Sequence, residues 1–439
     1  MNRIPTVPIN SKSINPNASN NPSIYPKLRI ADNEQVAYRF HTMLKPSGSA
    51  CNINCDYCFY LHKQDLLNQP KHPRMPEATL DQHIRQYIEA QFGAEEVVFT
   101  WQGGEPTLMG LDFFARVVEL QKQYCPDEMV ILNDIQTNGL LLDDKWCQFL
   151  AANNFLVGIS IDGPKHLHDR YRRTNNDKPT HDLVMAAIKR LKAYDIPFNA
   201  LCVVNDANAK EPLSVYRFLR DEVEPRMIQF LAGVEPLDFK QVAPLHWQPD
   251  SLKQIDELQD TSDLLAMHEV VTEWSVTPEG WGEFLTTVWQ EWIEADIGCV
   301  FVDHFENTLS QILNKGAQKC TTAAICGKAL ALEHNGDLYC CDHFVYPEYK
   351  LGNIHHTHQG DLAFSKKQTQ FGYLKQSTLP EYCKQCDFLT LCWGDCPKHR
   401  FIKTPDGEVG LSYLCAGLKM YYAQVSSDLS LVKSKLGWH

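Results

Sequence analysis

Cysteine is the residue type whose number and spacing say most about chemistry in this chain. The sequence has 16 cysteines among 439 residues, and its first residues contain no apolar core of the secretory type, so metal binding is expected rather than disulfide formation. Three thiols, Cys51, Cys55 and Cys58, share one short segment. Three thiolates on a four-iron cluster leave one iron open to the amine and carboxylate of a small molecule. A structural zinc site would need a fourth ligand, for which His62 is the best candidate.

A second group of cysteines lies near the end of the chain. Nine of them fall between residues 320 and 415, and eight thiolates can complete two four-cysteine sites. Iron–sulfur clusters and zinc both use such sets, and the spacing alone does not distinguish them. The adjacent pair Cys340 and Cys341 leaves one thiol spare. The isolated cysteines are predicted to be small buried hydrophobes; they are Cys125, Cys147, Cys202 and Cys299.

Short apolar runs alternate with amphipathic stretches through residues 36–232, after a flexible N-terminal extension predicted for residues 1–35. Strands are expected at 38–44, 96–101, 129–135, 155–161, 197–204 and 227–231. Helices are expected between them, at 80–92, 111–124, 144–153, 183–194 and 213–222. This alternation predicts an α/β fold with a parallel sheet, in the form of a partial (β/α)6 barrel. Its chemistry should lie at the C-terminal ends of the strands.

After residue 232 the regular alternation of apolar runs and amphipathic stretches ends. Residues 233–315 are predicted to form a connector with helices at 281–297 and 303–313, and the segment 237–275 is acidic in part. Residues 316–415 form a small cysteine-rich domain in which metal clusters replace a large core, and residues 416–439 form a C-terminal helix.

The overall composition excludes several classes of protein. Hydrophobic residues make up 44% of the chain and charged residues 22%, which is ordinary globular composition. The net charge of −13 disfavours a nucleic-acid partner, which would favour a basic face. No apolar run approaches the roughly 20 residues of a membrane-spanning helix. We therefore expect a soluble, cytoplasmic protein without a membrane or nucleic-acid partner.

Polar residues follow the predicted strands at the points where ligands bind in barrels. Glycines at 103 and 104 allow close approach of the backbone to a ligand. A Gly-Gly turn is a weak signal alone, but here it comes after a three-cysteine loop and at a strand end. The candidates are Gln102, Gly103, Gly104 and Glu105 after the second strand, Thr137 and Asn138 after the third, Ser160 and Asp162 after the fourth, and then Arg172.

These motifs, in this order, resemble the radical S-adenosylmethionine superfamily. The matching segments are CNINCDYCFY, WQGGEPTL, IQTNG and FLVGISIDGP. The resemblance implies that the first cluster binds S-adenosylmethionine, that the Gly-Gly turn holds its methionyl amino group, and that Arg172 meets its carboxylate. Tyr57 and Tyr60, within the cysteine loop, join the implied cofactor contacts.

From about residue 38 to residue 422 the chain resembles the anaerobic sulfatase-maturating enzymes, which carry a SPASM-type C-terminal domain. Further matching features are the Cys341-Asp342 step, LGNI at 351–354 and the CxxC-x5-C-x3-C block with a distal cysteine. The resemblance implies three [4Fe–4S] clusters. One auxiliary cluster takes Cys320, Cys326, Cys341 and Cys396, and the other takes Cys383, Cys386, Cys392 and Cys415. A departure is the row His355, His356 and His358, which is predicted to be a solvated loop.

The reaction implied by the resemblance is oxidation of a cysteine or serine in an unfolded or nascent sulfatase polypeptide to Cα-formylglycine. Asp342 would take the proton from the target thiol or hydroxyl, and an auxiliary cluster would take the second electron. A flavodoxin- or ferredoxin-type protein would donate the first electron. The residues do not decide whether the target is cysteine, serine or both.

Two alternatives stay open at this point. The first is another SPASM-type enzyme that forms a thioether or carbon–carbon crosslink in a small precursor peptide; only about 35 residues precede the barrel, which disfavours an added precursor-binding domain. The second is a non-enzymatic zinc-binding interaction module, which the GGEP and SIDGP motifs at strand ends speak against.

Overall fold

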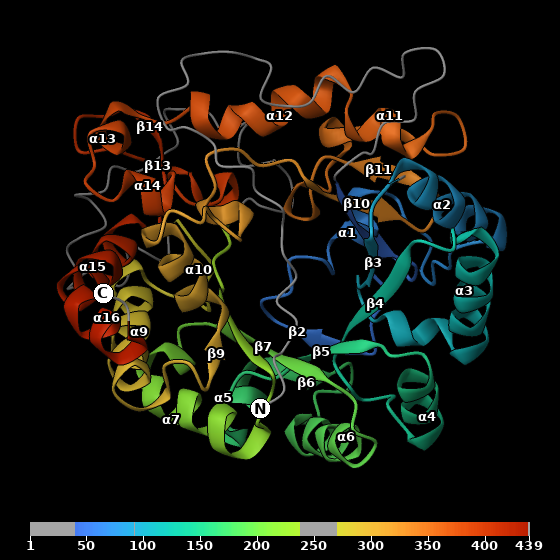
Figure 1. The fold of residues 1–439 in the computed structure, drawn as a ribbon, viewed down its shortest axis with the longest axis horizontal. Helices are drawn as coiled ribbons and strands as arrows, with labels where there is room; N and C mark the ends of the chain where they lie inside the picture. Colours follow the sequence, from blue (N-terminus) through green and yellow to red (C-terminus); the bar gives the residue numbers. More distant parts are fainter. Residues whose placement is uncertain (1–39, 92, 238–269, 438–439) are drawn as a thin grey trace.

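Six parallel neighbours form the centre of the sheet, as the sequence predicts. The computed structural model describes residues 40–91, 93–237 and 270–437; the extension at 1–35 and most of the 237–275 segment lie outside them. The strands are β1 (His41–Lys45), β3 (Glu96–Trp101), β4 (Val130–Thr137), β5 (Leu156–Ser160), β7 (Phe198–Val204) and β8 (Met227–Ala232). They curve into an open ring (Figure 1). The predicted partial barrel is confirmed.

Helices cover the outside of this ring (Figure 1). They are α2 (Glu77–Ala90), α3 (Leu111–Tyr124), α4 (Asp144–Ala152), α5 (Lys165–Tyr171), α6 (His181–Ala193) and α7 (Pro212–Phe218). Local signals set their bounds: the Asp143 side chain accepts from the Trp146 N–H at 2.9 Å and caps α4. Helix α3 has the predicted bounds, whereas α7 gives way to a π-helical turn over Leu219–Val223.

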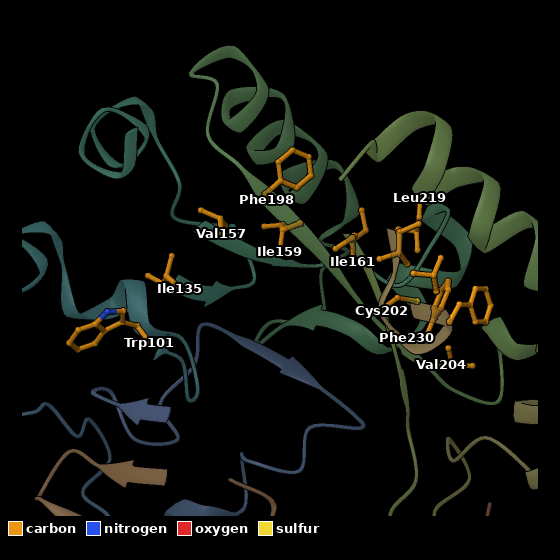
Figure 2. Packing of buried hydrophobic residues seen from close by; sticks show 14 of the residues in the cluster. Trp101, Ile135, Val157, Ile159, Ile161, Phe198, Cys202, Val204, Leu219 and Phe230 are labelled. Atoms are coloured by element: carbon orange, nitrogen blue, oxygen red, sulfur yellow. The ribbon is translucent and has the colours of Figure 1, made fainter. Parts of the chain in front are cut away.

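Apolar side chains from strands and helices meet in one large core (Figure 2). Val157 and Ile159 of β5 and Leu219 are fully buried, and burial of such a side chain contributes roughly 1.5–3 kcal/mol. Cys147 and Cys202 are buried here, as predicted. Cys125 is only partly buried.

The prediction for Cys299 is wrong, because this thiol is exposed. It lies in the turn between a π-helical segment, Trp292–Asp296, and the short strand β9 (Phe301–Val302). Gly298 has a φ of +80°, so the chain reverses at the surface just before the cysteine.

The cysteine-rich region extends the sheet of the barrel. Strand β10 (Ala329–Glu333) pairs in parallel with β1, from His41 opposite Ala329 to Lys45 opposite Glu333. Strands β11 (Asp337–Tyr339) and β12 (Lys350–Asn353) then add antiparallel, and β9 extends the other end beside β8. One sheet of ten strands therefore runs through both regions, and the domain boundaries at 232 and 315 stay predictions.

The C-terminal region packs on the barrel through helices. α9 (Pro278–Glu291) and α10 (Asp303–Ile312) correspond to the two helices predicted for the connector. α9 crosses α15 (Cys415–Ser427) so closely that a Cβ on Gly417 would lie 1.9 Å from the Pro278 carbonyl oxygen. The last residues form α15 and α16 (Leu429–Leu436), divided at Asp428, rather than one helix.

Shorter elements complete the cysteine-rich region, at the top of Figure 1. They are α11 (Gln359–Ala363), α12 (Lys366–Ser377), α13 (Glu381–Lys384), α14 (Leu389–Cys392), β13 (Ile402–Lys403) and β14 (Val409–Leu411). Of the row of histidines, His355 contacts the Thr79 hydroxyl at 3.0 Å and His358 caps α11. Among the described residues, no helix is long and apolar enough to cross a membrane.

Candidate active site

The three-cysteine loop follows β1 and is held by a small ladder. Strand β2 (Ile53–Cys55) pairs antiparallel with β6 (Arg172–Thr174), and this register sets Cys55 opposite Arg172. Burial, together with Glu105 and Cys58 nearby, raises the pKa of Cys51 to about 12. Burial raises the pKa of Cys55 as well, with Cys58 and Cys51 adding to it. The three thiols are therefore close together, and a metal would have to replace their protons.

The Gly-Gly turn after β3 packs on the backbone of this loop. The Gly104 N–H donates to the Gly48 carbonyl at 2.9 Å, and the Glu105 N–H donates to the Ala50 carbonyl at 2.9 Å. A Cβ on Gly104 would lie 2.1 Å from the Ala50 oxygen, and Gly103 has a φ of +124°. The close approach expected toward a ligand is thus, at Gly104, an approach to the cysteine loop itself.

The Glu105 carboxylate ties the ends of β3 and β4 together. It accepts from the Thr107 N–H at 3.0 Å, the Thr107 hydroxyl at 2.6 Å, the Thr137 hydroxyl at 2.8 Å and the Asn138 N–H at 2.8 Å. Burial raises its pKa, and these donors oppose that rise. The Asn138 amide also donates to Asn52 of the cysteine loop at 2.7 Å. Glu105 and Thr137 therefore make structural bonds, and cofactor contact remains a prediction for both.

Tyr57, Asp162 and Arg172 form a buried network beside the loop. The Tyr57 hydroxyl donates to Asp162, and Arg172 donates to the Tyr57 oxygen at 2.9 Å. The Val203 N–H donates to the other Asp162 oxygen at 3.0 Å. The buried Arg172 Nε has no hydrogen-bond partner among the described residues. An arginine with a spare buried donor fits an anionic ligand such as a carboxylate.

Two further predicted contacts lie at the same end of the sheet. Ser160 is the last residue of β5 and is half-buried. Gln102 is buried, and its N–H donates to the Leu44 carbonyl at 2.9 Å, which aligns the end of β3 with that of β1. The structure thus brings the predicted residues of four strand ends to one side of the barrel.

Asp342 forms an ion pair with Lys45 across the β1–β10 junction. Lys45 ends β1, and its ammonium also lies 4.6 Å from the centre of the Tyr60 ring. The Tyr60 hydroxyl donates to Glu333, the residue opposite Lys45 at the end of β10. Burial alone would raise the pKa of Asp342, but Lys45, with His343 and Lys398 nearby, outweighs burial and holds that pKa below its usual value. Asp342 is therefore ionised at neutral pH.

A second buried ion pair, missed by the sequence reasoning, joins the two regions at the same place. Lys398 pairs with Glu235, which follows β8, and its ammonium lies 4.6 Å from the centre of the Phe59 ring. Lys45 and Glu333 were also missed. A buried charge needs a partner, but no local pattern in the sequence marks Lys45 as buried.

Both sets of C-terminal cysteines are gathered as expected. Cys383, Cys386, Cys392 and Cys415 line one pocket. Burial raises the pKa of Cys341, and its neighbours Cys320, Cys396 and Cys326 raise it further, so these four also lie together. The spare thiol, Cys340, is fully buried in an apolar cluster.

The cysteine sulfurs in the described part of the chain are not placed to bind one common metal ion. Within the described ranges, no three histidine, cysteine or acidic side chains are placed to hold one metal ion. A four-iron cluster has a different requirement, because each of its cysteines binds a separate iron and the sulfurs are spaced more widely. Both sets therefore fit a cubane cluster in donor type and number.

Two family models match the chain. Residues 46–219 match the radical SAM superfamily, and residues 320–387 match the iron–sulfur cluster-binding domain named SPASM. A serine-type anaerobic sulfatase-maturating enzyme of Bacteroides thetaiotaomicron is 42% identical over 90% of this chain and 92% of the relative. The chain belongs to the anaerobic sulfatase-maturating enzymes. A cysteine-type member from Clostridium perfringens is 30% identical over 87% of this chain and 94% of its own.

Solved structures of anaerobic sulfatase-maturating enzymes share the fold. Native anSMEcpe with bound AdoMet and Cp18Cys peptide has a TM-score of 0.75 and 28% identity over 91% of this chain and 99% of its own. Streptococcus suis SuiB, at a TM-score of 0.56 and 14% identity, shows likeness of fold alone. The enzyme uses S-adenosylmethionine with a [4Fe–4S] cluster, and its SPASM domain binds auxiliary iron–sulfur clusters. The peptide-crosslinking and zinc-module alternatives are not favoured.

Proposed function

We propose that this enzyme oxidises a serine in a sulfatase polypeptide to Cα-formylglycine, with Asp342 as the general base. The preference for serine is supported by 42% identity to the serine-type member of Bacteroides thetaiotaomicron, whereas other serine-type members and a cysteine-type member are about equally distant, at 30–31% and 30%. The base role is supported by one observation above all. Asp342 is an ionised carboxylate beside a proposed cluster ligand, and Lys45 links it to the strand that leads into the three-cysteine loop.

The chemistry divides between the bound groups and the side chains. When bound, S-adenosylmethionine and the first cluster would supply the radical chemistry that removes one Cβ hydrogen, and an auxiliary cluster would accept the remaining electron. Asp342 accepts the proton of the serine hydroxyl, and this completes the loss of two hydrogens from the side chain. A serine hydroxyl does not ionise at neutral pH on its own, so a placed base is required.

Lys45 fixes the position of that base. Its side chain is 2% exposed and that of Asp342 is 14% exposed, so the carboxylate keeps a narrow route to solvent by which its proton can leave. The cation lies between the carboxylate and the Tyr60 ring, which restricts both groups. In this arrangement Asp342 is held ready in its charged form.

The residues that would hold the cofactors follow from the site. Cys51, Cys55 and Cys58 would bind the first cluster, and the spare Arg172 donor would meet the S-adenosylmethionine carboxylate. The same proposal includes an unfolded sulfatase segment as substrate, a flavodoxin- or ferredoxin-type electron donor and a cytoplasmic location.

A pair of matched peptides tests this function. Two sulfatase-derived peptides that differ only in serine or cysteine at the target position are incubated anaerobically with the reconstituted enzyme, S-adenosylmethionine and a reductant. We expect an aldehyde in the serine peptide, seen by mass spectrometry as the loss of two hydrogens. An aldehyde in the cysteine peptide alone overturns the serine preference. Cofactor cleavage without an aldehyde in either peptide overturns the function.

A further inference from the structure

His343 contacts two of the four cysteines proposed to hold one auxiliary cluster. Its side-chain Nδ1 lies 3.3 Å from the Cys396 sulfur. Its backbone N–H lies near the Cys341 sulfur, where it opposes the effect of burial on the pKa of that thiol. A cysteine that ligates iron is a thiolate without a proton to give, so the imidazole nitrogen must be the donor to Cys396.

The surroundings fix the histidine ring in this position. Phe59 packs edge-on against it with ring centres 5.7 Å apart, and Phe59 directly follows Cys58 of the first loop. His343 belongs to the short 3-10 turn Asp342–Phe344, whose first residue pairs with Lys45 and whose last residue is buried. The imidazole donor is thus held between the two cluster regions.

We propose that His343 is a positioning residue that raises the reduction potential of the auxiliary cluster bound by Cys320, Cys326, Cys341 and Cys396. The proposal rests on the ligand set and electron-acceptor role given under the proposed function. N–H donors to ligand sulfurs draw negative charge away from the cluster. Because reduction adds one negative charge, such donors stabilise the reduced state.

The turn Asp342–Phe344 places the proposed proton acceptor, Asp342, next to His343, which contacts a ligand of the cluster proposed as electron acceptor. Asp342 would receive the proton of the substrate. His343 would raise the reduction potential of the auxiliary cluster that receives the electron of the substrate radical. A cluster of more positive potential takes an electron more readily from the substrate radical. Loss of the imidazole donor should therefore slow aldehyde formation more than cofactor cleavage.

Two substitutions at position 343 test the donor. His343→Phe keeps a ring against Phe59 but removes the nitrogen, whereas His343→Asn keeps an N–H donor near the place of Nδ1. Midpoint potentials of all clusters in the full reconstituted enzyme are measured by redox titration monitored with electron paramagnetic resonance. We expect a more negative potential for one auxiliary cluster in His343→Phe, and a return toward the parent value in His343→Asn. The second auxiliary cluster should not change.

A matched control and a ligand variant complete the test. His304 is also buried against aromatic rings, and its Nε2 has no hydrogen-bond partner in the part of the chain that the structure describes. His304→Phe should leave every potential unchanged. Cys396→Ala checks the ligand set separately, because it should remove one auxiliary signal whatever His343 does. An unshifted potential in His343→Phe at full iron content overturns the proposal. If that variant loses the cluster, His343→Asn decides: a parent-like potential supports the proposal, and a shifted one overturns it.

Discussion

Replacing Asp342 by asparagine separates the two halves of the proposed reaction. The asparagine keeps the size of the side chain and an oxygen that can accept from Lys45, but it cannot take a proton. Cleavage of S-adenosylmethionine does not involve this residue, so 5′-deoxyadenosine should form at the parent rate. A general base typically contributes 10²- to 10⁴-fold, and we expect a fall of about that size in aldehyde formation, about 3–5 kcal/mol in activation free energy.

Asp342→Asn should also lower the stability of the fold, and the experiment must measure that loss. Lys45 is buried, with only 2% of its side chain exposed, and removal of one partner of a buried ion pair typically costs about 3–5 kcal/mol. The cost in Asp342→Asn should be smaller, because the amide oxygen still accepts a hydrogen bond and the Tyr60 ring still faces the ammonium. Melting temperature and iron content are therefore measured beside both products.

A second buried ion pair provides the matched control. Glu235→Gln neutralises the partner of Lys398, where both side chains are less than a tenth exposed; within the described ranges Glu235 forms its ion pair with Lys398 and Asp342 forms its own with Lys45. This variant should keep the parental ratio of aldehyde to 5′-deoxyadenosine. A near-parental aldehyde yield in Asp342→Asn at full cluster occupancy would refute the base role. An equal loss in both variants would show that the ion pairs matter only for the structure.

Three more predictions follow from the site and the core. Replacing Cys51, Cys55 and Cys58 together by alanine should abolish 5′-deoxyadenosine formation and lower the iron content from about twelve to about eight per chain. Persistent cleavage of S-adenosylmethionine would contradict the assignment of these three ligands. Gly104→Ala sets a methyl group 2.1 Å from the Ala50 oxygen, so cleavage should fall sharply while auxiliary iron remains; unchanged cleavage would show that the loops separate easily. Burial raises the pKa of Asp134 to about 7. Between pH 4 and 7 the folded chain therefore keeps a proton that the unfolded chain releases, and the free energy of unfolding falls as pH rises through that window. Asp134→Asn should therefore gain in melting temperature over the parent from pH 4 to 7 and keep a constant gain above it; a gain independent of pH would be evidence against this reasoning.

The periodic part of the fold could be predicted from the sequence. The six barrel strands stand out because each is a short run rich in β-branched and aromatic residues, and α3 spans Leu111–Tyr124 as expected. The sequence did not indicate β10, β11 and β12. These strands are three to five residues long, and their pairing with β1 depends on contacts between distant segments rather than on a local pattern.

In the candidate site, too, local patterns could be predicted and contacts between distant segments could not. Cysteine spacing marked the three thiols of the first loop, because ligand spacing within a loop is a local property. The choice of Cys341 over Cys340 and the division of the C-terminal cysteines into two sets came from the family resemblance. The ion pair between Lys45 and Asp342 was not predicted, since its two partners lie far apart in the sequence. Glu105 shows the opposite case: the motif marked it as a cofactor contact, whereas its carboxylate accepts from four protein donors.

The pairing of β1 with β10 has a consequence for biosynthesis. His41 and its partner Ala329 are separated by roughly 290 residues, so a ribosome working at about 5–20 residues per second makes the second strand roughly 15–60 s after the first. During that interval one edge of β1 has no partner, and an open strand edge invites pairing with other chains. A fragment that stops before residue 329 would keep this edge open permanently. A barrel fragment with its first cysteine loop would therefore be prone to association through this edge, and iron is better supplied to the full-length chain.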